Sequence, residues 1–288
     1  MNPNSPQNPN NPNNANNRNP NHAPQPPHPS YNSNPPTYGT SHPAASSMNG
    51  SNPPSFNLTN RNASTALNNE ILRLANAFSY PALLALINSP NSQADMSPIN
   101  YATAISRLGR VKRYDRQAVT TSPLFHQYLS TLQYHLETNF DAFELRHISN
   151  IVHSLGKLEF CHEGLLNIVV QNTQAIVENN KAVQGVSNIC WGLANIPNFT
   201  SGAEFFLSVL QRSEWILNEG SPQELANVAW SVAKAGINGP SVTAFFNMIE
   251  QSAINGTLCS LMPDRRNEQD IANLLWAAGT LKIPLRGL

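Results

Sequence analysis

Residues 221–236 read SPQELANVAWSVAKAG, and other parts of the chain follow nearly the same line. Residues 184–194 read QGVSNICWGLA, and residues 269–279 read QDIANLLWAAG. Two weaker copies precede them, HISNIVHSLG at 147–156 and YATAISRLG at 101–109. Such self-similarity is typical of a repeat array, in which each unit packs mainly against its neighbours. The sequence therefore predicts a long surface for a long partner rather than one deep catalytic pocket.

Each copy has the features of an amphipathic helix. In the best copy, Ser221 suits the N-cap position and Glu224 suits its partner in a capping box. Apolar residues recur with helical spacing from Leu225 onward, and Gly236 suits the left-handed position that ends a helix. A second amphipathic segment, residues 242–253, follows after a turn. The unit is therefore a helix–turn–helix pair.

The same pair recurs along the chain. The other predicted pairs are residues 99–108 with 124–136, 145–155 with 164–177, and 186–195 with a helix that starts from a capping box at 201–204 and continues to residue 216. We therefore predict an all-α fold, an α-solenoid of about four and a half stacked units over residues 96–288. The wider spacing before the last copy indicates a loop insertion at residues 255–264.

The segment before the repeats has a different composition. Residues 1–64 are mostly Asn, Pro, Ser and Gln, and Arg18 and Arg61 are their only charged residues. Such a segment buries too little apolar surface to offset its chain entropy, so we predict a disordered Asn/Pro-rich arm. Residues 65–95 are richer in Leu, Ile and Ala, which predicts a capping or degenerate helix at about residues 66–87.

Bulk properties argue against several functional classes. Beyond the arm, 15 basic residues face 17 acidic ones, so any phosphate contact must come from local patches. The three cysteines, Cys161, Cys190 and Cys259, are widely spaced, which favours a reducing compartment such as the cytoplasm or an organelle matrix. The chain has no apolar run of about 20 residues and no recognised catalytic motif. We therefore expect no enzymatic activity, cofactor, metal, membrane insertion or small-molecule substrate.

The line at residues 221–236 resembles the octotricopeptide-type repeat of organellar RNA-binding proteins. It also resembles the helical regions of FAST-kinase-like and RAP-domain proteins, and repeats with the pattern Leu-Ala-Asn-x-x-Trp-Ala in bacterial effector-like proteins. The resemblance covers about residues 96–281 and is clearest over 184–279. It implies a non-catalytic protein that binds single-stranded RNA and acts in RNA processing, stability or translation.

A protein-binding solenoid is the main alternative. The acid-free Ser/Asn/Pro-rich N-terminus suits the unfolded export signal of a secreted bacterial effector, which would act in a host cell. The neutral to slightly acidic array also suits a protein partner better than RNA.

Variable polar positions beside the apolar stripe are the sharper candidates for reading RNA bases, because a repeat code needs variable polar side chains on a constant frame. These residues are Gln184, Ser187, Asn195, Gln223, Ser231 and Gln269. The recurring Asn188, Asn227 and Asn273 could also read a base edge. Asn188, Asn227 and Asn273 could instead form a hydrogen-bonded ladder between neighbouring helices, which we favour. For Trp191, Trp230 and Trp276 we favour packing between repeats over base stacking.

Basic residues are the candidates for holding phosphates. One dense patch follows the first helix of the first copy and consists of Arg107, Arg110, Lys112, Arg113 and Arg116, with Tyr114 among them. Lys157, Lys234 and Lys282 stand near the ends of later first helices, so stacking would place them along one edge. An equally good interpretation is that these cations stabilise the negative ends of helix dipoles.

Overall fold

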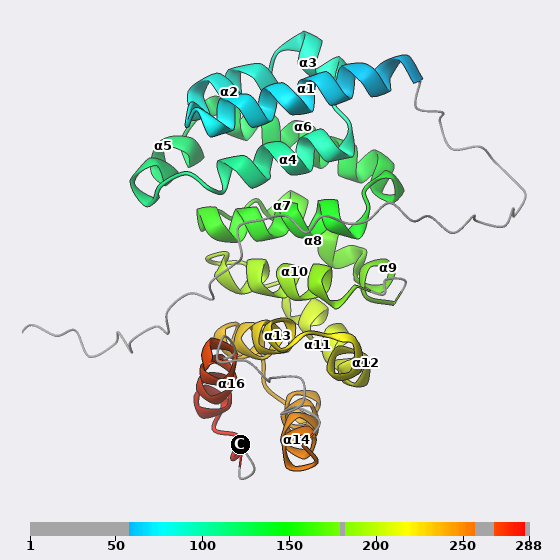
Figure 1. Ribbon diagram of the computed structural model, residues 1–288, viewed down its shortest axis with the longest axis vertical. Coiled ribbons are helices and arrows are strands. Elements are labelled where there is room, and N and C mark those ends of the chain that lie inside the picture. The colour runs from blue at the N-terminus through cyan, green and yellow to red at the C-terminus, as the bar shows by residue number, and fades with distance from the viewer. Residues whose placement is uncertain (1–57, 179–181, 257–267, 286–288) are drawn as a thin grey trace, which may run out of the picture.

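The computed structural model describes residues 58–178, 182–256 and 268–285 (Figure 1). Every regular element in these ranges is a helix, which confirms the predicted all-α class. Residues 1–57 of the predicted arm and residues 257–264 of the predicted insertion lie outside the described residues. The first helix, α1 (Leu58–Asn76), begins within the segment that its composition assigned to the arm.

The first helices of successive units pack side by side in chain order. They are α1, α4 (Pro98–Leu108), α7 (Leu145–Leu158), α10 (Val183–Asn195), α13 (Pro222–Lys234) and α16 (Glu268–Leu281). Each contacts the next one, and we call this series the first-helix row. Figure 1 shows α4, α7 and α10 running alongside one another, whereas α16 has turned away from their direction.

The second helices form another series alongside the first-helix row, and α6, α8 and α11 lie behind it in the view of Figure 1. This second-helix row consists of α2 (Tyr80–Ile87), α6 (Pro123–Asn139), α8 (Glu163–Gln171) with α9 (Thr173–Glu178), α11 (Ala203–Gln211) with α12 (Ser213–Glu219), and α14 (Pro240–Ile254). Neighbouring members contact one another along the row. Short helices α3 (Pro90–Asp95) and α5 (Arg116–Thr120) lie in the connections.

Segment 65–95 is more than the single capping helix that we predicted. Helices α1 and α2 form a pair in which α1 contacts α4 and α2 contacts α6, so the pair continues both rows. The chain reverses at Phe78, whose φ of 54° lies in the left-handed region. The predicted continuous helix over 66–87 is therefore wrong, because the turn at Phe78 separates two packed helices.

Two of the second helices are broken, although the apolar pattern predicted them as continuous. The break between α8 and α9 lies at Asn172, whose side-chain amide donates to the carbonyl of Ile168. The break between α11 and α12 lies at Arg212, whose guanidinium donates to the carbonyl of Val177 on the neighbouring unit. Next to Arg212, Ser213 Oγ donates to the carbonyl of Leu210 at 2.5 Å. Local side-chain bonds such as those of Asn172 and Ser213 compete with the helical ladder, whereas the Arg212 bond joins two units. The predicted capping box at 201–204 is also wrong, since α11 begins after Gly202 without a side-chain cap.

The predicted ends of the best repeat are confirmed. The backbone N–H of Ser221 donates to Glu224 Oε2 at 2.8 Å, and the N–H of Glu224 donates to Ser221 Oγ at 3.4 Å. This reciprocal pair starts α13 after Ser221 because it satisfies two N–H groups that lack helical partners. Gly236 has a φ of 69°, the left-handed conformation that ends the helix.

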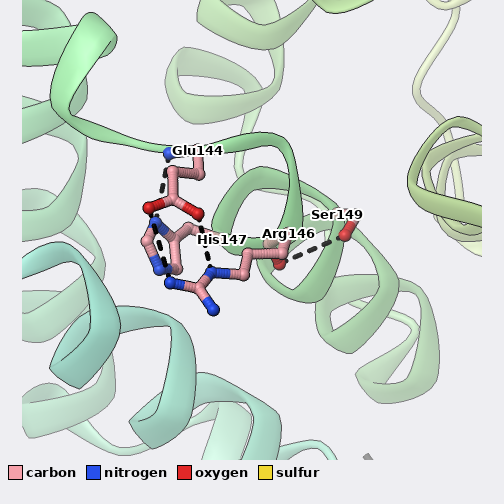
Figure 2. Close-up of polar contacts among 4 residues, drawn as sticks. All are labelled: Glu144, Arg146, His147 and Ser149. Carbon is pink, nitrogen blue, oxygen red and sulfur yellow. Dashed lines mark hydrogen bonds and ion pairs between the residues drawn. The ribbon is translucent and has the colours of Figure 1, made fainter. Parts of the chain in front are cut away.

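Helix α7 begins with a different polar cap (Figure 2). The backbone N–H of Glu144 donates to His147 Nδ1 at 3.1 Å, and Arg146 forms an ion pair with Glu144 at 2.8 Å. Ser149 Oγ donates to the carbonyl of Arg146 at 3.1 Å. This cap requires a neutral His147, because only a deprotonated Nδ1 accepts a hydrogen bond.

Small residues set the close spacing of the first-helix row. A Cβ added at Gly156 would lie 2.7 Å from the Cα of Gly192, and one added at Gly192 would lie 2.5 Å from the carbonyl oxygen of Val152. Helices α7 and α10 therefore touch backbone to backbone at these two glycines. The close approach fixes how the two helices lie against each other and hence where their ends stand.

Candidate nucleic-acid interface

Aligning the copies shows which side chains the stacking brings into line. We call the residue at the Asn position of each copy its anchor, and the anchors are Thr103, Asn150, Asn188, Asn227 and Asn273. Seven residues after the anchor, the first four copies carry Arg110, Lys157, Asn195 and Lys234. This position falls at or just beyond the C-terminal end of α4, α7, α10 and α13. Because neighbouring first helices contact each other, these ends stand along one edge of the row.

Cations at this edge act on one another. We call Arg107, Arg110, Arg116, Lys157 and Lys234 the basic edge. Arg110 is exposed, and the other four are half-buried. Burial, reinforced by the charges of Arg110 and Arg116, lowers the pKa of Lys157. Burial and Arg110 likewise lower the pKa of Arg107. Charges of one sign that converge in a partly desolvated place favour the binding of an anion.

The connection after α4 carries the other predicted RNA-binding residues of the dense patch. The basic residues Lys112 and Arg113 are exposed, and Tyr114 between Arg113 and Asp115 is 74% exposed. The ammonium group of Lys112 lies 5.7 Å from the centroid of the Tyr114 ring. An exposed aromatic ring flanked by cations can stack on a base while its neighbours contact phosphates.

One acidic residue at this edge was absent from the sequence-based candidates. Glu159 Oε1 accepts a hydrogen bond from Arg116 at 2.9 Å across 43 residues of sequence. It also interacts electrostatically with Lys234. Glu159 follows α7 with a left-handed φ of 53°. Its position two residues after Lys157 was visible in the sequence, but its partners on α5 and α13 depend on the stacking.

Lys234 is held in place by its neighbours. Its ammonium donates to Asn195 Oδ1 at 2.6 Å and lies 4.7 Å from the centroid of the Trp230 ring. Asn195 in turn donates through Nδ2 to the carbonyl of Trp191 at 2.7 Å. Asn195, a predicted base-reading residue, is therefore engaged in joining α10 to α13. Burial lowers the pKa of Lys234, and Glu159 partly opposes that shift.

Burial removes four of the predicted base-reading residues. Asn227 is 2% exposed, and Ser187, Ser231 and Asn273 are fully buried. The hydroxyl of Ser231 donates to the carbonyl of Asn227 at 2.6 Å, within α13. Side chains that are buried to this extent cannot contact RNA, so assigning these four to base reading was wrong. Asn273 accepts a hydrogen bond from Gln269 at 3.0 Å within α16, so the ladder between helices stays a prediction.

Other base-reading candidates reach the surface. Gln184 is exposed, whereas Asn188, Gln223 and Gln269 are half-buried. They come from α10, α13 and α16, so they lie on successive members of the first-helix row. Gln269 also donates to Asn273, which fixes its amide.

The tryptophans pack between helices. Trp191 and Trp230 are 4% and 3% exposed. The ring of Trp191 lies 4.7 Å from that of His153, and the ring of Trp230 lies 6.0 Å from that of Trp276, measured between centroids. The preference for packing over base stacking is therefore confirmed for Trp191 and Trp230, because a buried ring offers no face to a nucleotide.

Away from the basic edge, two adjoining surface hollows of about 430 Å³ each lie between α12 and α14. Glu214 and Met248 line both, with Leu217 in one and Trp215 in the other. Over the described residues, no group of three or more His, Cys, Asp or Glu side chains is placed to hold a metal ion. No helix there is both long and apolar enough to cross a membrane.

Comparisons with known proteins add no relative. No protein-family model, curated protein or solved structure matches this chain. The resemblance to octotricopeptide-type repeats therefore stays a prediction from the repeat line itself.

Proposed function

We propose that the stacked helix pairs form an α-solenoid that binds single-stranded RNA without catalysing a reaction. The phosphates lie along the basic edge, and the bases reach Gln184, Asn188 and Gln223 on the exposed side of the first-helix row. In keeping with the resemblance, the protein acts in RNA processing, stability or translation.

The observation that carries this proposal is the recurrence of a cation at one position in three of the repeat copies. Arg110, Lys157 and Lys234 stand seven residues after their anchors on α4, α7 and α13. Asn195 of the third copy accepts a hydrogen bond from Lys234. A linear polyanion suits such an arrangement, because cations at one edge of the row can meet successive phosphates. The helix-dipole interpretation explains each cation by itself, but it does not explain why Arg110 and Arg116 both act on Lys157.

Binding of the full chain to a labelled single-stranded RNA pool, measured by fluorescence anisotropy at two salt concentrations, tests the proposal. One variant carries Arg110→Gln, Lys112→Gln and Arg113→Gln, which are all exposed positions. We expect binding by the unmodified chain that weakens with salt, and at least about tenfold weaker binding by this variant.

A control variant separates a local site from net charge. Arg61→Gln, Arg73→Gln and Arg146→Gln remove the same number of charges from other exposed positions, two of which are in surface ion pairs. We expect this control to keep near-normal affinity, because surface pairs contribute little to stability and the basic edge is intact. An equal loss of RNA affinity in both variants would show that net charge, and not a local site, controls binding. No binding at low salt would overturn the RNA proposal.

A protein partner is the second candidate function. The hollows between α12 and α14 favour it, because Trp215, Leu217 and Met248 lie beside Glu214 there. Arg212 also lines the hollow that contains Trp215, with its guanidinium carbon 4.2 Å from the centroid of that ring. Apolar side chains flanked by a carboxylate and a guanidinium suit a peptide with an apolar anchor. If RNA fails to bind at low salt, substitution of Met248 in a search for protein ligands tests this second candidate.

A further inference from the structure

Helix α16 presents a face that the other first helices keep covered. Two large apolar side chains on it are exposed, Ile271 at 37% and Leu275 at 47%. Their equivalents on α13, Leu225 and Ala229, are buried. The equivalent pairs in the earlier copies are also buried: Tyr101 with Ile105, Ile148 with Val152, and Val186 with Cys190. The repeat therefore normally covers this side of a first helix.

A glycine on α16 occupies a position where other first helices meet the next helix of the row, and no described residue fills that place here. Gly279 occupies the position of Gly109 on α4 and Gly156 on α7. A Cβ at Gly109 would lie 3.1 Å from Ser154 of the next first helix, and one at Gly156 would lie 2.7 Å from Gly192. At Gly279, no atom lies within 4 Å of the added Cβ. The residue that admits the next helix elsewhere meets no neighbour here.

Trp276 adds an aromatic side chain to this surface. Its equivalent on α13, Trp230, is 3% exposed and has the Trp276 ring 6.0 Å away, whereas Trp276 itself is only half-buried. Helix α16 therefore covers the tryptophan of α13, whereas the tryptophan of α16 is partly exposed. We call Ile271, Ala272, Leu275, Trp276 and Gly279 the α16 face.

We propose that the α16 face docks one helix of the first-helix type from a partner polypeptide, independently of RNA binding. The established packing within the row specifies that helix. It is amphipathic and carries a small residue opposite Gly279, as Ser154 does opposite Gly109 and Gly192 does opposite Gly156. Helix α13 has Ser231 at this same position. The occupant thus continues an interface that the row already uses between α4, α7 and α10.

A second copy of this chain, stacked head to tail, does not supply that helix. In such a stack the second copy would present α1, which begins the first-helix row. The exposed positions of α1 include Thr65, Asn69 and Arg73, which are polar. Polar side chains of this kind do not match the apolar α16 face. A helix from a different polypeptide is therefore the occupant that the packing favours.

The test uses a labelled peptide of residues 220–237, which spans α13 with both of its caps and is held helical by a side-chain cross-link. Its anisotropy is measured against the full chain. We expect saturable binding that Gly279→Leu and Leu275→Lys each weaken by at least about tenfold, a loss of about 1.4 kcal/mol or more. Both positions are exposed, so folding should be retained, and circular dichroism checks this.

Matched controls separate docking on the α16 face from general stickiness. Ile254→Lys replaces a side chain of α14 that is 57% exposed, and it should leave peptide binding unchanged. A peptide with Ser231→Leu should bind at least about tenfold more weakly, because bulk at that position prevents close approach to Gly279. No binding, or binding insensitive to Gly279→Leu, would overturn the proposal. Self-association that Gly279→Leu abolishes would instead make a second copy the occupant.

Discussion

At the scale of single residues, one position of the repeat has different roles in different copies. Asn195 stands where three other copies have a cation, and its amide joins Lys234 to the end of α10. We predict that Asn195→Ala lowers the free energy of unfolding by about 1–2 kcal/mol, since a half-buried ammonium then lacks its acceptor. Gln184→Ala, at an exposed position of the same helix, should change it by less than about 0.5 kcal/mol. Urea unfolding measures both, and equal effects would contradict this role for Asn195.

Two buried histidines should make stability depend on pH. Burial lowers the pKa of His147 to about 4 and that of His153 to about 3. The unfolded chain takes up these protons near pH 6.5, so the folded state loses stability as the pH falls from about 6.5 towards 4. We predict that His153→Phe flattens this dependence by up to about 1.4 kcal/mol per pH unit. Urea unfolding at a series of pH values tests it, and an unchanged slope would count against the buried neutral imidazole.

At the scale of elements, glycines test the close spacing of the row. A Cβ at Gly192 would meet the carbonyl oxygen of Val152 at 2.5 Å, so Gly192→Ala must push α7 and α10 apart. We predict a loss of about 1–3 kcal/mol in unfolding free energy. Gly279→Ala meets no atom within 4 Å and should stabilise α16 by about 0.5–1 kcal/mol. Thermal unfolding compares the two variants, and similar effects would contradict the difference in packing.

At the scale of the whole molecule, the basic edge and the basic connection after α4 should together control how RNA affinity depends on salt. Each phosphate neutralised on a single strand contributes about −0.7 to the slope of log affinity against log salt concentration. Removing Arg110, Lys112 and Arg113 should therefore flatten the slope by about 2. Titrations between low and moderate salt measure it. An unchanged slope would place the phosphates elsewhere.

Local patterns in the sequence predicted much of the fold, because a helix is specified by contacts within a few residues. The apolar spacing of α13, the box of Ser221 with Glu224 and the left-handed Gly236 are all local features, and each is confirmed. The apolar pattern missed the breaks at Asn172 and Ser213, where side chains bond to carbonyls three or four residues earlier. It also could not show that Arg212 bonds to the carbonyl of Val177 across 35 residues, because stacking decides that contact.

The sequence by itself therefore determined the helical class, the repeat and the candidate basic residues. Only the tertiary structure decided which polar residues of the repeat reach the surface. Asn188 is half-buried while Asn227 is 2% exposed, although both occupy the same position of the repeat line. It also decided that Glu159 joins the basic edge and that the α16 face stays open. The physical reason is that periodicity specifies a face of one helix, whereas burial depends on the neighbours that stacking brings against it.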